Sequence, residues 1–343
     1  MDLRFTANNG IVDSAIKELL DLVGPIRHRS IVREMIIAAL KAGQENPEKA
    51  DLKIMCGTLK EMRYTAKVFG AYRHTRKITL FGSARTAPDN PLYQMAKEFG
   101  RKLAACGFMV ITGGGPGVML AANEGAGLEK SFGVSIRLPI EQKSNPVMNG
   151  SARDITYKYF FNRKVAFIKE ACAVALFPGG FGTLDEAMEA LTLLQTGKRY
   201  PIPVVLMDRP GDTYWSGWMG FMKDHLASGG YIGPNDFAFF HHTHDVDEAV
   251  AVIEGFYRRY HSLRFVGGQS VIRMISELAE PCIGELKREF ADLITDGGDM
   301  VLSGALPKEC DEPELSHLPR LVVDFDKRDF ARLRQLIDAI NSK

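Results

Sequence analysis

The 343-residue sequence has no long apolar run and no excess of charge of one sign. Its longest clear apolar run covers residues 171–177, far short of the roughly 18–20 residues that a membrane-spanning helix needs. Its 43 basic and 42 acidic side chains leave a net charge of +1, which argues against a broad nucleic-acid-binding surface and an acidic tail. We therefore expect neither a membrane nor a nucleic acid as a partner.

Cysteine is also scarce, and its spacing fits neither a disulfide framework nor a cysteine-based metal site. The five residues are Cys56, Cys106, Cys172, Cys282 and Cys310. Their number is odd and no pair forms a CxxC motif. The first ten residues lack the charged and then apolar layout of a signal peptide. Reduced thiols in a cytoplasmic protein are the simplest interpretation.

Hydrophobic periodicity divides the chain into three parts. We expect a helical N-terminal extension over residues 1–76, a central domain over residues 77–260 and a mostly helical C-terminal extension over residues 261–343. In the middle part, short apolar runs alternate with helical stretches, which predicts an α/β fold with a parallel sheet and helices on both faces. The predicted strands are 78–81, 108–112, 133–137, 173–177 and 204–207.

The two extensions carry no motif with readable chemistry. Apolar spacing near 3.6 residues predicts N-terminal helices over about residues 11–23, 30–42 and 47–72. In the C-terminal part the expected elements are helices over about 270–293 and 327–341 and a strand at 320–324.

Two of the predicted strands end in glycine-rich turns. Gly82 and Ser83 follow the first strand, and Gly113, Gly114, Gly115 and Gly117 follow the second, just ahead of Met119. Such turns leave backbone N–H groups open to an anion at a helix N-terminus. Ordinary tight turns are the alternative interpretation. The second turn is neither a GxGxxG fingerprint nor a P-loop, which disfavours a nicotinamide dinucleotide.

The third turn, at residues 178–186, is the most informative. Gly179, Gly180 and Gly182 expose backbone, and Thr183 adds a hydroxyl. Glu186 lies in the first helical turn, where a carboxylate also stabilises the helix dipole, so a purely structural role is the alternative. A carboxylate beside a phosphate cradle is unfavourable for binding alone, which favours a role in catalysis.

Arg163 and Lys164 form a basic pair on a predicted helix between the second and third turns. The arginine offers a planar donor fork for a phosphate or a polar ring, which lysine does not match. A solvent-exposed basic pair is the alternative interpretation.

The combination of GGGPGVM, NRK and PGGFGTLDE resembles the Lonely Guy (LOG) family of cytokinin riboside 5′-monophosphate phosphoribohydrolases, many once misnamed lysine decarboxylases. The resemblance spans about residues 77–253. It implies a Rossmann-like sheet, usually in homodimers, and hydrolysis of a nucleoside 5′-monophosphate such as AMP to free base and ribose 5-phosphate. Many short members have a histidine where this chain has Phe161, so the base pocket is expected to differ.

The resemblance also implies residue roles. Arg163 and Glu186 match the family's catalytic arginine and glutamate. The nucleotide- and phosphate-binding set is Gly82, Ser83, Gly113, Gly114, Gly115, Gly117, Met119, Lys164, Gly179, Gly180, Gly182 and Thr183. No cofactor and no metal is expected. The partners expected are the nucleotide substrate and a second copy, or more, of the chain.

Three alternatives stay open. A non-catalytic nucleotide-binding regulatory protein would use the same cradle without releasing base. A molybdenum-cofactor carrier of similar fold would not need Glu186. A pyridoxal-phosphate lysine decarboxylase needs a Schiff-base lysine, and no lysine here lies in an environment that argues for one. His241, His242 and His244 look like a polar loop, because no further metal ligand lies at a suitable spacing.

Overall fold

The computed structural model describes residues 3–6, 8–46, 48–139 and 144–343. The chain divides into two compact units, Met1–Ala66 and Lys67–Lys343. None of the helices within the described ranges has the length and apolar character that a bilayer crossing requires.

The first unit is helical, as predicted. It contains α1 (Ile11–Val23), α2 (Arg29–Glu45) and most of α3 (Lys49–Gly70). A small core of Leu3, Ile16, Leu20 and Ile37 holds α1 and α2 together. The predicted start of the third helix at Pro47 lies outside the described residues.

The end of α3 belongs to the second unit. The Phe69 ring stacks on Phe132 with centroids 4.5 Å apart, and the Tyr72 ring meets Phe132 edge-on at 5.2 Å. Aromatic packing of this kind ties the helix end to the sheet. The division into compact units thus falls within α3, between residues 66 and 67, and the domain boundary after residue 76 stays a prediction.

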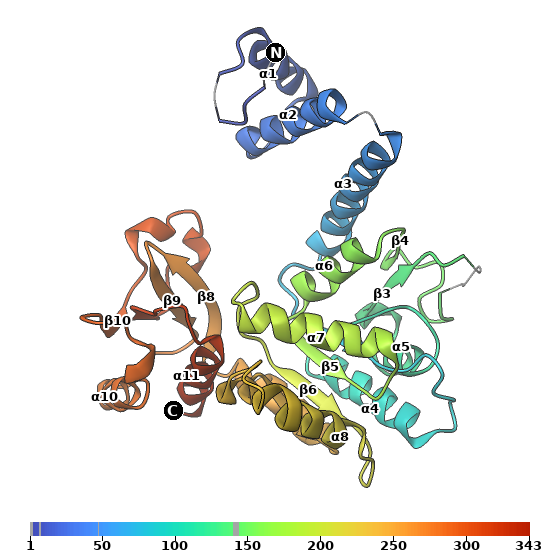
Figure 1. Ribbon diagram of the computed structural model, residues 1–343, viewed down its shortest axis with the longest axis vertical. Helices are drawn as coiled ribbons and strands as arrows, with labels where there is room; N and C mark the ends of the chain where they lie inside the picture. Colours follow the sequence, from blue (N-terminus) through green and yellow to red (C-terminus); the bar gives the residue numbers. More distant parts are fainter. Residues whose placement is uncertain (1–2, 7, 47, 140–143) are drawn as a thin grey trace. The chain divides into compact units, whose positions relative to one another are not determined.

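The second unit is built on a seven-stranded sheet in which every neighbouring pair is parallel (Figure 1). Its strands are β1 (Lys77–Phe81), β2 (Met109–Thr112), β3 (Ser131–Ile136), β4 (Asp154–Tyr157), β5 (Ala173–Leu176), β6 (Val204–Met207) and β7 (Phe240–Thr243). The order is β4-β3-β2-β1-β5-β6-β7. All five predicted strands are confirmed, and the two edge strands β4 and β7 were missed.

Helices cover both faces of this sheet, which confirms the Rossmann-like α/β fold. The helices are α4 (Pro91–Ala105), α5 (Val118–Ala126), α6 (Phe160–Glu170), α7 (Phe181–Gln195), α8 (Tyr214–Phe221) and α9 (Val246–Phe256). Successive strand residues point to opposite faces. In β1, Ile78 and Leu80 join the core under α4, α5 and α9, whereas Phe81 joins the core under α6 and α7.

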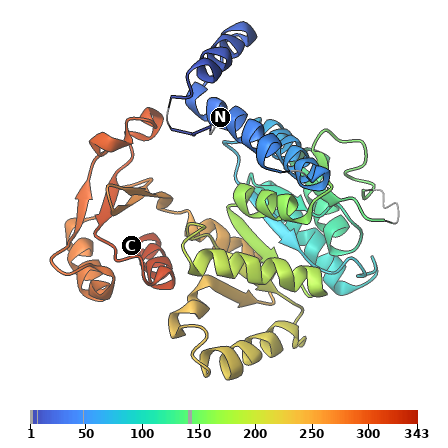
Figure 2. The same cartoon turned by 45° about the horizontal axis from the view of Figure 1, so that its top comes forward.

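The C-terminal part holds more strand than predicted. A separate antiparallel sheet, in the order β10-β11-β9-β8, accompanies two helices (Figure 2, orange and red). The elements are β8 (Tyr260–Val266), β9 (Gln269–Met274), α10 (Glu280–Glu289), β10 (Met300–Ser303), β11 (Arg320–Val323) and α11 (Phe330–Ser342). The predicted last helix and the strand near residue 320 are confirmed, but the helix expected from residue 270 is wrong at its start, where β9 lies.

A two-glycine hairpin explains this correction. Gly267 and Gly268 have φ values of 59° and 97° and join β8 to β9. A Gly-Gly turn between two apolar runs favours a β-hairpin. The C-terminal part also joins the core directly, because the Arg334 guanidinium donates to the Ile202 carbonyl at 2.9 Å and the Asn341 amide donates to the Phe256 carbonyl at 2.6 Å. It therefore belongs to the same compact unit.

Candidate active site

The strand order brings the three glycine turns together. β1 lies between β2 and β5, so the turns after these strands meet at the carboxyl edge of the sheet. The β1 turn is hydrogen-bonded to both of the others. The Ser83 N–H donates to the Pro178 carbonyl at 3.0 Å, and the Val118 N–H donates to the Ser83 carbonyl at 3.0 Å.

A cleft of about 730 Å³ opens at this edge. The predicted site residues that line it are Gly82, Ser83, Gly113, Met119, Arg163, Gly179, Gly180, Gly182, Thr183 and Glu186. Phe81, Ala84, Arg85, Phe167, Phe181, Leu184 and Tyr214 complete the lining. Residues more than 100 positions apart in the sequence thus converge on one cavity, as the three turns predicted.

Four predicted residues lie outside this lining. Lys164 forms an ion pair with Asp185 at 2.7 Å, an arrangement that gives no support to a phosphate-binding role. Gly114 and Gly115 are held within their own turn, because their carbonyls accept hydrogen bonds from Asn145. Gly117 packs closely against Ser83 and Ala84 of the β1 turn, which lines the cleft.

Gly117 is expected to be intolerant of any side chain. Its φ of 66° is unfavourable for other residues, and an added Cβ would overlap the Ser83 carbonyl oxygen. We predict that Gly117→Ala lowers the free energy of unfolding by about 1–3 kcal/mol, measured by urea denaturation. Gly180→Ala is the matched control, because a Cβ there meets no atom within 4 Å and φ is −92°. Equal stability losses in both variants would contradict this packing argument.

A buried polar cluster holds the second glycine turn in place. The Thr112 hydroxyl donates to Asn123 Oδ1 at 2.7 Å, and Asn145 Nδ2 donates to the same oxygen at 3.0 Å. The Gly114 N–H donates to the Thr112 hydroxyl at 3.0 Å. Sequence reasoning missed Asn123 and Asn145, because asparagines that act through buried side-chain contacts carry no local motif.

The third turn is positioned from two sides. Gly179 packs so closely on the Thr183 side chain that a Cβ would overlap its hydroxyl. The Tyr214 hydroxyl donates to the Gly179 carbonyl at 2.7 Å. The Thr183 and Leu184 N–H groups already donate to the Gly180 carbonyl, at 3.0 Å and 3.1 Å. The backbone donors that remain for an anion are those at the very start of α7, where Gly180 and Gly182 line the cleft. Tyr214 is a further residue that the sequence analysis did not single out.

Glu186 is the most unusual ionisable group of the cleft. Its residue is 3% exposed, and its Oε2 has no hydrogen-bond partner within the described structure. Burial raises the pKa of this carboxyl to about 7, and the positive charges of Lys164 and Arg163 offset only part of that increase. A carboxyl that titrates near neutral pH in a cleft is suited to general acid–base chemistry.

Arg163 reaches the same cleft from α6. Its guanidinium lies over the rings of Phe160 and Phe167, at 4.8 Å and 5.4 Å from their centroids. Burial lowers its pKa, whereas the charges of Glu186 and Asp185 act in the opposite direction. Its Nε is buried and has no hydrogen-bond acceptor among the described residues.

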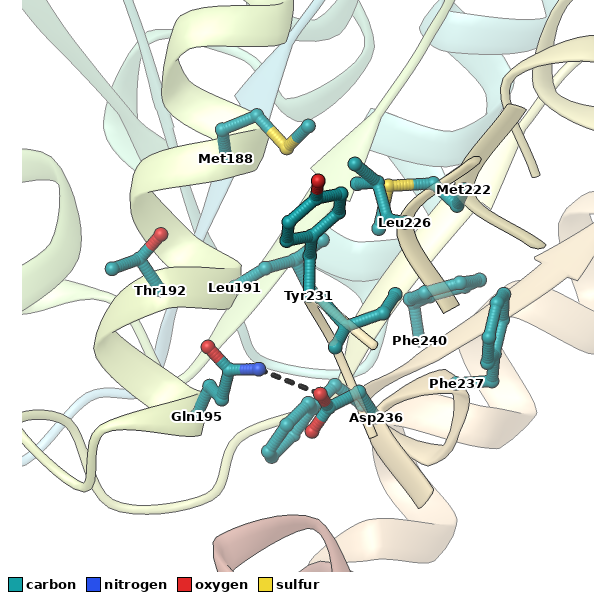
Figure 3. A pocket seen from close by; sticks show the side chains of 12 residues that line it. Met188, Leu191, Thr192, Gln195, Met222, Leu226, Tyr231, Asp236, Phe237 and Phe240 are labelled. Carbon is teal, nitrogen blue, oxygen red and sulfur yellow. Dashed lines mark hydrogen bonds between the residues drawn. The ribbon is translucent and has the colours of Figure 1, made fainter. Parts of the chain in front are cut away.

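A second cavity of about 360 Å³ lies against the other end of α7 (Figure 3). Its lining is mostly apolar, with Met188, Leu191, Met222 and Phe240 among the side chains drawn. The Gln195 amide donates to the Asp236 carboxylate at 2.6 Å, so the acidic group is already engaged. None of the predicted site residues lines this cavity, and the cleft at the sheet edge remains the candidate active site.

The fold and the cleft together define an open parallel α/β protein with an anion-suited site at the carboxyl edge of its sheet. The model of a family described as possible lysine decarboxylase matches residues 117–253, which include Arg163 and all of residues 178–186. This part of the chain is similar to that family, and the Lonely Guy resemblance is confirmed there.

Solved structures similar to this chain share only modest identity. The protein TM1055 is 26% identical, with 52% of this chain and 99% of that chain covered and a TM-score of 0.38. The molybdenum cofactor carrier protein of Chlamydomonas reinhardtii is 23% identical, with 52% and 96% covered and a TM-score of 0.36. The molybdenum cofactor binding protein of Rippkaea orientalis is 20% identical, with 52% of this chain and 96% of that chain covered and a TM-score of 0.37. No curated protein matches the chain. Likenesses at these TM-scores carry no functional argument.

Proposed function

We propose that the protein hydrolyses the N-glycosidic bond of nucleoside 5′-monophosphates, such as AMP, and releases the free base and ribose 5-phosphate. The observation that carries this proposal is the Glu186 carboxyl, which is buried at the cleft, lacks a partner for one oxygen and has a pKa of about 7. The family match over residues 117–253 supports it.

Glycosidic cleavage passes through a ribosyl cation with oxocarbenium character. The C1′–N bond breaks, a water oxygen bonds to C1′, and the departing base gains a proton. The ionised Glu186 carboxylate stabilises the cation or accepts the proton of the attacking water. The Arg163 guanidinium orients the phosphate or polarises the departing base, since both are acceptors for its donor fork.

The glycine turns hold the 5′-phosphate in this proposal. The N-terminus of α7 presents backbone donors and the positive end of the helix dipole, and Thr183 adds a hydroxyl beside Gly179. Phosphate binding aligns the ribose with Glu186, so binding energy from a remote group lowers the barrier at C1′. The roles of the glycines, like the predicted homo-oligomer and cytoplasmic location, stay predictions.

The substrate test is a panel of AMP, GMP, CMP, UMP and isopentenyl-AMP, with free base and ribose 5-phosphate quantified for each. We expect cleavage of at least one monophosphate. The kcat/KM for the matching nucleoside should be lower by about 100-fold or more, because the nucleoside cannot use the phosphate cradle. Nucleotide binding without base release across the panel would favour the non-catalytic regulatory protein. Equal cleavage of nucleoside and nucleotide would contradict the cradle.

A further inference from the structure

Three side chains with metal-ligating atoms converge at the carboxyl edge of β6 and β7. Asp208 directly follows β6, His242 lies in β7, and His244 directly follows β7. These two strands are parallel neighbours, paired at Leu206 and His242. The sequence showed no further metal ligand at a suitable spacing from the histidine run, and the structure supplies one, Asp208, from the end of a different strand.

The three side chains share one carboxylate oxygen. His242 Nε2 lies 2.9 Å from Asp208 Oδ1, and His244 Nδ1 lies 2.8 Å from the same atom. One ligand atom from each residue falls within 4.8 Å of the others. Asp208 is fully buried, and its Oδ2 accepts the Trp215 N–H at 3.1 Å. The backbone donor fixes the carboxylate so that Oδ1 faces both imidazoles.

We propose that Asp208, His242 and His244 bind a divalent transition-metal ion of the zinc type. Two imidazoles and one carboxylate favour Zn²⁺, Co²⁺, Ni²⁺ or Fe²⁺ over Mg²⁺ and Ca²⁺, which prefer all-oxygen sites. In a tetrahedral site, metal–ligand bonds of about 2.0–2.2 Å place neighbouring ligand atoms about 3.3–3.6 Å apart. The contacts of the two imidazoles to Oδ1, at 2.9 Å and 2.8 Å, are shorter than this. The imidazoles therefore move apart from the carboxylate by about half an ångström when an ion binds.

The site has an open side. His244 lines a cleft of about 620 Å³ together with Arg209, Asp212 and Val246. Three protein ligands leave at least one coordination position for water or an exogenous anion. His242 lies deeper than His244, with side chains 18% and 41% exposed. An ion would therefore enter from the His244 side.

A purely hydrogen-bonded cluster is the competing explanation, because each imidazole N–H can donate to the carboxylate. The neighbouring His241 separates the two explanations. Its Nε2 lies 2.7 Å from Glu248 instead, so it belongs to the same run but not to the cluster. It provides a matched control for any effect of removing a histidine from this strand.

The test is Co²⁺ titration of the chelator-treated full-length protein, followed by visible absorption and by equilibrium dialysis. We expect saturable 1:1 binding with a d–d band, and displacement of Co²⁺ by Zn²⁺. His244→Ala and His242→Ala should each weaken the affinity for Co²⁺ about 100-fold or more. Loss of a residue that only hydrogen-bonds to a metal ligand typically costs up to about 100-fold, and loss of a ligand should cost at least as much. His241→Ala should bind Co²⁺ like the wild-type protein. Absence of saturable binding, or unchanged affinity in both cluster variants, would overturn the proposal.

Discussion

The Glu186→Gln variant is expected to lose about 100- to 10,000-fold in kcat for monophosphate cleavage, the range typical of removing a positioned acid–base group. The substitution keeps the shape of a side chain that is 3% exposed but removes its charge. Because the proposed role acts on the developing cation and on water, kcat should fall more than KM rises. Steady-state kinetics with the best substrate of the panel measures both.

Glu189→Gln is the matched control for this experiment. Glu189 lies one turn further along α7, is half-buried with its side chain 41% exposed, and lies outside the cleft lining. We expect its kcat to stay within about threefold of wild type, as for a surface substitution of a few tenths of a kcal/mol. Equal losses in the two variants would point to a general effect of charge on α7 rather than to catalysis by Glu186.

The same carboxyl should make the wild-type protein less stable as the pH rises. Burial raises the pKa of Glu186 from 4.5 to about 7, so the folded state holds a proton that the unfolded state releases earlier. The stabilising effect of that proton is complete below about pH 4.5 and is lost as the pH rises through 7. At pH 8 an ionised carboxylate is buried in the folded state.

Glu186→Gln should therefore stabilise the fold at pH 8 by up to about 3 kcal/mol, from 1.36 kcal/mol for each unit of pKa shift, and by much less near pH 4.5. Urea unfolding at both values measures the difference. Glu189→Gln should show no comparable dependence on pH. A stability gain from Glu186→Gln that is equal at both pH values would show that ionisation is not its cause. A variant that is inactive yet more stable is the expected signature of a buried catalytic carboxyl.

The core of the fold was predictable because buried parallel strands are short apolar runs with turn signals at both ends. The edge strand β7 was not, since its sequence FHHT lacks such a run and resembles a polar loop. The antiparallel hairpin of β8 and β9 did carry a signal in Gly267 and Gly268. The helical periodicity of α10, just after the hairpin, led the sequence analysis to extend a helix back over β9.

The site was predictable as a set of turns but not as a set of contacts. Strand order places the turns side by side, and ten of the predicted residues line one cleft. The sequence predicts Glu186 in the first helical turn, but α7 begins at Phe181 and its first turn holds no acidic residue. The sequence also does not reveal which acidic residue near the start of α7 is exposed, like Asp185, and which is buried, like Glu186. Nor does it reveal that Lys164 is paired with Asp185. Both depend on packing between α6 and α7.

The most direct test of the account is mass spectrometry of the products formed from AMP in ¹⁸O-labelled water. Hydrolysis at C1′ predicts adenine and ribose 5-phosphate in equal amounts, with one solvent oxygen in the sugar phosphate, from the wild-type protein and from Glu189→Gln. Glu186→Gln should form both at a rate lower by about 100-fold or more. Wild-type rates from Glu186→Gln, or no base release from any monophosphate of the panel, would contradict the account.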